Sequence, residues 1–238
     1  MPTDLLAALS GLPSTSVLIA LIVASSLLVI TADWRLLNLI LGAQYLLIGV
    51  FLIVVGIEEF PVELAIVKAL VGTMIVPVLY ITARRARWGK PPDEDETEVV
   101  ETPRPRLAWL RSPSPSALLR TGLALRAIVA VIGAAIALSL ALRSPIAITT
   151  SQTSSRDISI ATFVLIGQGL LNIALNENPL KAGLGLLTVM AGFEMFYTVI
   201  EPTLLVVALL GLVNLVIALA LSFLITAWAT RPREVTAR

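Results

Sequence analysis

The chain has 238 residues, of which 57% are hydrophobic and only 14% are charged, and its formal net charge is +1. A soluble domain of this size cannot bury so much apolar surface, so the composition predicts a protein whose main solvent is lipid. The sequence has no cysteine and no histidine. This excludes a thiolate-held iron–sulfur cluster, a disulfide framework and a His- or Cys-ligated haem within this chain. We expect no metal, no cofactor and no nucleic-acid partner.

Runs of apolar residues follow one another along the chain, and a transmembrane helix needs about 20 of them. In chain order, the predicted spans are Ser14–Ile30, Leu36–Ile57, Val62–Thr82, Thr121–Leu142, Ile158–Leu175, Leu180–Ile200 and Thr203–Trp228. Serine and threonine dilute the start of the first span. The sequence therefore predicts an all-α, polytopic transmembrane helix bundle of about seven helices.

The distribution of positive charge predicts an orientation, because lysine and arginine near the membrane favour the cytoplasmic side. With seven spans, most cationic residues fall on one side of the membrane, and only Arg143 and Arg156 fall on the other. We therefore expect a multi-pass protein of the cell membrane, with its amino terminus outside and its carboxyl terminus in the cytoplasm.

Four segments are expected. Residues 1–83 form an N-terminal three-helix membrane unit, 84–120 a cytoplasmic linker, 121–142 a connecting transmembrane helix, and 143–238 a C-terminal three-helix unit. The linker is rich in proline and in mutually repelling acidic residues, which favour an extended chain. It could tether a neighbouring subunit or serve only as a solvated connector. Both three-helix units enter from the same side, so they are predicted to run parallel, as a duplicated module would.

Two ionisable side chains, Lys68 and Glu194, are isolated inside apolar spans, where a charge at mid-helix costs roughly 2.5–3.5 kcal/mol. Lys68 lies six residues after Val62, and Glu194 lies six residues before Ile200. At 1.5 Å per residue, both lie about 9 Å below the outer boundary, at matching depth in different units. The carboxylates closer to that boundary are expected to be solvated: Glu58, Glu59, Glu63 and Glu201.

The role of these two charges has more than one interpretation. In a proton relay, an amine and a carboxyl in a low dielectric exchange protons with water or with neighbouring groups. In a structural role, they form an ion pair between the two units or pair separately with partner subunits. Lys68 could also extend to the outer interface. Among the neutral groups, Gln44, Gln168 and Asn214 are expected to bond across helices, and Pro77 is expected to kink the third span.

A resemblance to a known family is carried by three stretches: Leu36-Leu37-Asn38, Lys68 through Pro77 to Ala83-Arg84-Arg85, and Asn178-Pro179-Leu180-Lys181 leading to Glu194. They resemble the component E membrane subunit of formate-hydrogenlyase-type hydrogenases. The carboxyl-terminal part, Ile158–Trp228, is similar to the small three-helix subunit called chain 4L, or K, of respiratory complex I, the NADH–quinone oxidoreductase. It is also similar to the C subunit of multisubunit Na⁺/H⁺ antiporters.

This resemblance implies a non-catalytic membrane subunit of a complex I-like or membrane-bound hydrogenase-like complex, beside antiporter-like and other membrane subunits. It would contribute to proton or Na⁺ translocation coupled to electron transfer in other subunits, with no activity alone. Two buried glutamates carry protons in the complex I subunit. Here Glu194 lies about two turns further into its helix than the family carboxylate, and Asn214 stands where the second is expected. Glu194 and Lys68 are the candidates for proton transfer, and we expect no residue to be catalytic.

Two other functions stay open on the sequence alone. One is a small secondary transporter with a binding site between the two units, for which Gly167-Gln168-Gly169 is the only hint of a broken helix. The other is a purely structural subunit that holds larger subunits together.

Overall fold

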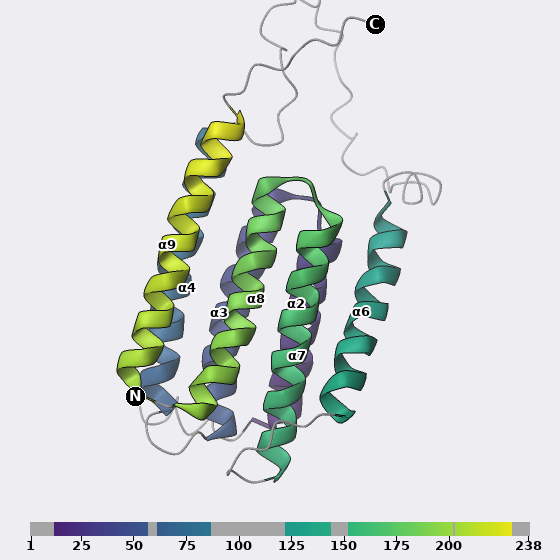
Figure 1. The fold of residues 1–238 in the computed structure, drawn as a ribbon, viewed down its shortest axis with the longest axis vertical. Coiled ribbons are helices and arrows are strands. Elements are labelled where there is room, and N and C mark those ends of the chain that lie inside the picture. Colours follow the sequence, from purple (N-terminus) through teal and green to yellow (C-terminus); the bar gives the residue numbers. More distant parts are fainter. Residues whose placement is uncertain (1–11, 57–60, 87–121, 144–151, 202, 230–238) are drawn as a thin grey trace, which may run out of the picture.

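The computed structural model describes residues 12–56, 61–86, 122–143, 152–201 and 203–229. Within these ranges the chain forms seven α-helices and no strand (Figure 1). The helices are α2 (Ser14–Ile30), α3 (Trp34–Val55), α4 (Pro61–Arg85), α6 (Leu123–Arg143), α7 (Gln152–Leu175), α8 (Pro179–Ile200) and α9 (Leu204–Ala229). The predicted all-α bundle is confirmed. The predicted linker lies almost entirely outside the described residues.

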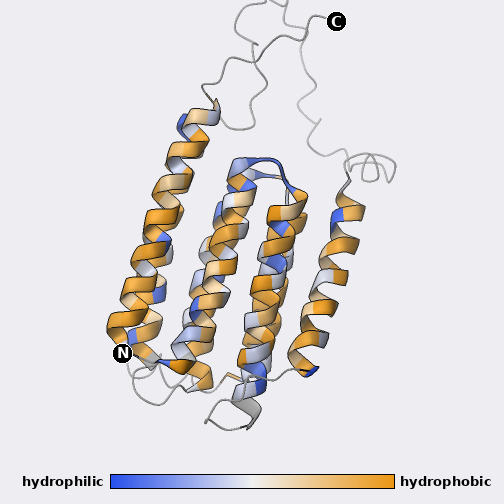
Figure 2. Cartoon of the chain, viewed as in Figure 1, coloured by the Kyte–Doolittle hydropathy of each residue, from blue (hydrophilic) through white to orange (hydrophobic). Residues whose placement is uncertain are grey.

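Six of these helices are long and apolar enough to cross a membrane, while α2, with 17 residues, is shorter. Figure 2 shows hydrophobic residues along the whole length of the helices and polar residues gathered at the turn between α7 and α8. On α9, Leu205 and Phe223 are 79% and 73% exposed. Such large apolar side chains are stable on an outer surface when lipid surrounds it. The chain is therefore a multi-pass membrane protein.

One predicted boundary is wrong. Helix α7 begins at Gln152, six residues before the predicted start at Ile158. The apolar run marks only the part of a helix that suits lipid, whereas the first turns of α7 are polar and still helical. Within these turns Asp157 accepts a hydrogen bond of 2.7 Å from the Ser14 hydroxyl of α2. This bond joins the polar first turns of α7 to the start of α2.

Helices α2–α4 and α7–α9, which belong to the two predicted three-helix units, lie against each other. Contacts join α2 to α7, α3 to α8 and α4 to α9, so each helix touches the helix at the same position in the other unit. In Figure 1, α7 and α8 lie in front of α2 and α3, and α6 stands at the side, where it contacts α7 and α2. We call the end of the bundle where α8 finishes the Ile200 end, and the opposite end, where α4 finishes, the Arg85 end. Duplication of a three-helix module stays a prediction.

Two glycines allow a close approach between helices at the interface of α7 and α8. A Cβ atom on Gly169 would lie 2.7 Å from the carbonyl oxygen of Gly185, and one on Gly185 would lie 2.7 Å from the carbonyl oxygen of Gly169. The two backbones are thus in direct contact, as small residues permit in membrane helices. This interface fixes α8, the helix that carries Glu194.

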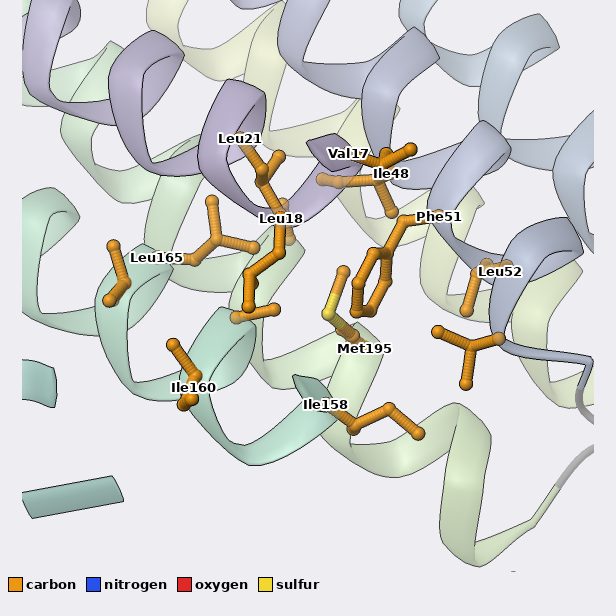
Figure 3. Close-up of a cluster of buried hydrophobic side chains, with 14 of the residues drawn as sticks. Val17, Leu18, Leu21, Ile48, Phe51, Leu52, Ile158, Ile160, Leu165 and Met195 are labelled. Carbon is orange, nitrogen blue, oxygen red and sulfur yellow. The ribbon is translucent and has the colours of Figure 1, made fainter. Parts of the chain in front are cut away.

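Two apolar clusters fill the bundle, one toward each end. Figure 3 shows the cluster nearer the Ile200 end, in which side chains from α2, α3, α7 and α8 meet around Phe51 and Met195. The second cluster contains residues of α3, α4, α8 and α9 nearer the Arg85 end, among them Leu41 and Leu187. On α3 the change from one cluster to the other falls between Tyr45 and Ile48. The buried charges lie near this level.

Candidate functional site

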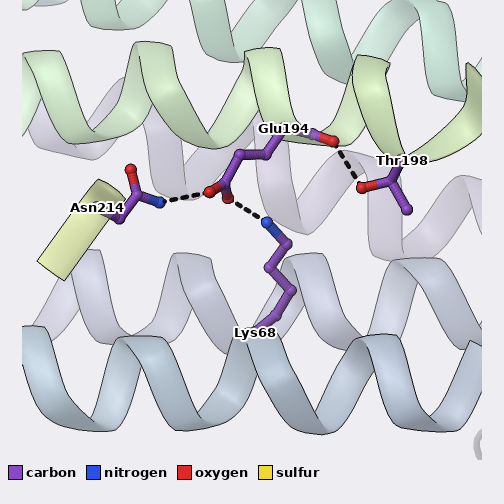
Figure 4. A network of polar contacts seen from close by, with 4 residues as sticks. All are labelled: Lys68, Glu194, Thr198 and Asn214. Carbon is purple, nitrogen blue, oxygen red and sulfur yellow. Dashed lines mark hydrogen bonds and ion pairs between the residues drawn. The ribbon is translucent and has the colours of Figure 1, made fainter. Parts of the chain in front are cut away.

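Lys68 of α4 and Glu194 of α8 form an ion pair inside the bundle, between Lys68 Nζ and Glu194 Oε2 (Figure 4). The two side chains are only 2% and 0% exposed. Lys68 belongs to the first three-helix unit and Glu194 to the second. Their matching depth in the sequence made them possible partners, and the structure brings them together. Lys68 does not extend to the interface, because its amine is directed at Glu194.

Both carboxylate oxygens of Glu194 have a partner. Oε2 contacts Lys68, and Oε1 accepts a hydrogen bond of 3.0 Å from Asn214 Nδ2 of α9 (Figure 4). Three helices from both units therefore meet at one carboxylate. Thr198, one turn along α8, donates a 2.7 Å bond to the backbone carbonyl of Glu194 rather than to its carboxylate.

The charges in this network compensate each other. A lone charge in the hydrocarbon region is costly, and a buried pair is tolerated when both groups also make hydrogen bonds. Transfer of one proton from Lys68 to Glu194 would leave an amine and a carboxylic acid, both neutral. The pair can therefore exist in an ionic and a neutral form without a change in total charge. That property suits both a structural contact and a proton-transfer element.

Tyr45 of α3 is a member of this neighbourhood that the sequence reasoning missed. Its side chain is completely buried. Tyr45 packs against Gly72 of α4, where an added Cβ atom would lie only 2.6 Å from the Tyr45 Cβ atom. Gly72 follows Lys68 by four residues and so lies on the same face of α4. A tyrosine in the middle of an apolar span was the signal in the sequence.

The three amide side chains predicted to bond across helices differ in their hydrogen bonds. Asn214 bonds across helices to Glu194, and Gln168 Nε2 donates a 2.8 Å bond to the Ala130 carbonyl of α6. Gln168 thus joins α7 to α6 and is no part of the network around Glu194. Gln44 of α3 is completely buried, but neither of its amide atoms has a hydrogen-bond partner within the described chain. Among the described residues, the expected bond across helices is therefore not seen for Gln44.

A second buried lysine lies at the Arg85 end. Lys181 of α8 is only 6% exposed, and its Nζ donates a 2.9 Å bond to the backbone carbonyl of Thr31, which follows α2. The backbone carbonyl of Lys181 in turn accepts a bond from Asn172 of α7. In the sequence, Lys181 stood out only as part of the stretch Asn178-Pro179-Leu180-Lys181, and its burial was not expected. Its contact ties the turn after α2 to the start of α8.

The other predicted residues lie outside the network. Glu63 and Glu201 are exposed, while Glu58 and Glu59 lie outside the described residues. Helix α4 runs without interruption through Pro77, so the proline does not end the helix, and the kink stays a prediction. In the described ranges, no group of three or more Asp or Glu side chains could hold a metal ion.

Together these observations define a class: a polytopic α-helical membrane protein with an amide-supported ion pair between two packed three-helix units. No protein-family model, no curated protein and no solved structure matches the chain. A function can therefore be inferred only from the residues of the chain and the geometry of this site.

Proposed function

We propose that the chain is a non-catalytic subunit of a complex I-like or membrane-bound hydrogenase-like complex in the cell membrane. In this proposal it contributes to proton, or Na⁺, translocation that is coupled to electron transfer in other subunits. It lies beside antiporter-like and other membrane subunits, with its amino terminus outside and its carboxyl terminus in the cytoplasm.

The observation that carries the proposal is the contact of Lys68 and Asn214 with the carboxylate of Glu194, deep among apolar helices. Ionisable groups at such positions cost free energy and in membrane proteins frequently belong to proton or ion pathways. The pair holds one mobile proton between two sites. Because it joins the two three-helix units, movement of either unit changes the environment of both charges.

Asn214 stands where the resembled family has a second carboxylate, and its contact with Glu194 suggests what it does instead. The family pattern has a second carboxylate near this position, whereas an amide cannot take up a proton near neutral pH. In this chain the amide supports the one carboxylate that is present. Lys68 supplies the second titratable group, so the proposed relay has a Glu–Lys pair instead of two glutamates.

A purely structural role is the second candidate, and the same ion pair favours it. Lys68 and Glu194 link a helix of one unit to a helix of the other, and the loss of either side chain leaves a buried charge unpaired. The third possibility, a secondary transporter, gains no such support. Transporter sites typically use broken helices, whereas α7 is continuous through Gly167 and Gly169.

The test is to introduce Glu194→Gln, Lys68→Met and the double substitution into the intact membrane complex, and to measure assembly and ion pumping separately. The relay predicts reduced pumping in every variant that assembles, including the double variant, in which no unpaired charge is left in the bundle. Exposed Glu63 provides a matched control, since Glu63→Gln removes one carboxylate from the same helix as Lys68 without touching the pair.

Normal assembly and normal pumping in all three variants would eliminate the relay. Loss of assembly in both single variants, with assembly and pumping both restored in the double variant, would assign the pair to structure alone.

A further inference from the structure

Four buried polar atoms of α3 and α9, two helices that contact α4 or α8, make no hydrogen bond within the described chain. They are Gln44 Nε2, Gln44 Oε1, the Tyr45 hydroxyl and Asn214 Oδ1. All three side chains are completely buried. Burying an amide or hydroxyl without a partner costs about 1–3 kcal/mol on the protein scale, so nearly all such groups have one.

Each of these side chains can be placed relative to Glu194. Asn214 is bonded to its carboxylate through Nδ2, which leaves Oδ1 beside the same group. Tyr45 packs over Gly72, which lies one helical turn from Lys68 toward the Arg85 end.

The position of Gln44 is given by the packing of α3 against α8. It lies between Leu41 and Ile48 on one face of α3, since residues three and four apart share a face. Leu41 belongs to the same apolar cluster as Leu187, and Ile48 to the same cluster as Ala191. Gln44 therefore lies on the face of α3 that packs into the core shared with α8.

The mixture of hydrogen-bond donors and acceptors among these atoms identifies the kind of ligand that they can bind. Gln44 Nε2 donates, Gln44 Oε1 and Asn214 Oδ1 accept, and the Tyr45 hydroxyl does both. A bound cation needs acceptors only, and the ammonium group of Lys68 would repel it. Water both donates and accepts, and buried waters typically make about three hydrogen bonds to otherwise unpaired groups.

We propose that Gln44, Tyr45 and Asn214 bind a small group of ordered water molecules on the Arg85 side of the Lys68–Glu194 pair. These waters give Glu194 a proton donor and acceptor other than Lys68. The role of these waters in proton transfer rests on the proposed relay. Their binding at this site does not depend on it.

Radiolytic hydroxyl-radical labelling tests the hydration directly, because radicals formed from bound water oxidise the side chains next to it. The full-length chain in lipid nanodiscs is irradiated, and oxidation of each residue is measured by mass spectrometry relative to the denatured chain. Phe51 is the matched control: it is an equally buried aromatic residue on the same helix, within the apolar cluster. Tyr45 is expected to be oxidised severalfold more than Phe51.

Two variants locate the water. Gln44→Leu is expected to lower the oxidation of Tyr45 severalfold, because it removes two of the groups that bind water. Gln168→Leu removes another buried amide, at the α6–α7 interface, and is expected to leave Tyr45 oxidation unchanged. Oxidation of Tyr45 no greater than that of Phe51, or unaffected by Gln44→Leu, would overturn the proposal. Since no partner subunit is needed, this result is independent of the pumping assay.

Discussion

Lys68 and Glu194 are 126 positions apart in the sequence, yet their side chains meet as an ion pair in the interior of the bundle. Each belongs to a different three-helix unit, so this contact is a link between the units as well as a pair of titratable groups. Asn214 adds a third helix to the same carboxylate.

Removal of one charge should destabilise the protein more than removal of both. Lys68→Met or Glu194→Gln alone leaves a buried group without its partner, and breaking such pairs costs about 3–5 kcal/mol. The double variant should regain most of this loss. The measurement is reversible unfolding in detergent for all four proteins, read as a double-mutant cycle. Additive effects of the two substitutions would contradict an energetic link between them.

Asn214→Leu should cost about 1.5–3 kcal/mol, because it removes a hydrogen bond to a charged group and leaves Glu194 Oε1 without that donor. The same unfolding assay measures this. Ser139→Ala is a suitable control, since the Ser139 hydroxyl bonds only to the Ile136 carbonyl of its own helix at an exposed position. An Asn214→Leu variant as stable as the control would show that the amide contributes little to the site.

Gly169→Ala should weaken the packing of α7 on α8. The added methyl group would lie 2.7 Å from backbone atoms of Gly185 and Val189, which cannot rotate away. Overpacking of this kind costs about 1–3 kcal/mol. Gly42→Ala is the milder comparison, because its closest neighbour, at 3.1 Å, is a side-chain methyl of Val76. Thermal unfolding should rank wild type and Gly42→Ala above Gly169→Ala, and the reverse order would refute the close contact.

The proposed orientation can be measured by cysteine accessibility, because the natural sequence has no cysteine. Glu177 and Glu201 are exposed residues that flank the two ends of α8. With the cytoplasmic side at the Arg85 end, a membrane-impermeant maleimide should label Glu201→Cys in intact cells. It should label Glu177→Cys only after permeabilisation. The opposite pattern would invert the topology that the positive charges predict.

The sequence predicted the helices well, because the requirement for about 20 apolar residues is nearly independent of context. It missed the start of α7, since the residues from Gln152 onward are helical without being apolar. It could not assign the buried faces either. Membrane helices are apolar on all sides, so periodicity does not mark the side that packs against protein.

Part of the candidate site was also predictable from the sequence. Lys68 and Glu194 stood out because charges within spans are rare, and their depth could be counted from the span ends. The uncharged residues around the ion pair could not be identified in this way. Tyr45 and Gln44 look like ordinary span residues until the packing of α3 against α4 and α8 is known.

The separation of the ion pair along the chain has a consequence for biosynthesis. The ribosome completes α4 before it has made α8, so Lys68 reaches the bilayer before its counter-charge has been synthesised. During this interval α4 must be retained with an unpaired amine, which costs roughly 2.5–3.5 kcal/mol at mid-helix on insertion scales. Glu194 can remove this cost only after α8 has been made, so closure of the pair is a late step in the assembly of the bundle.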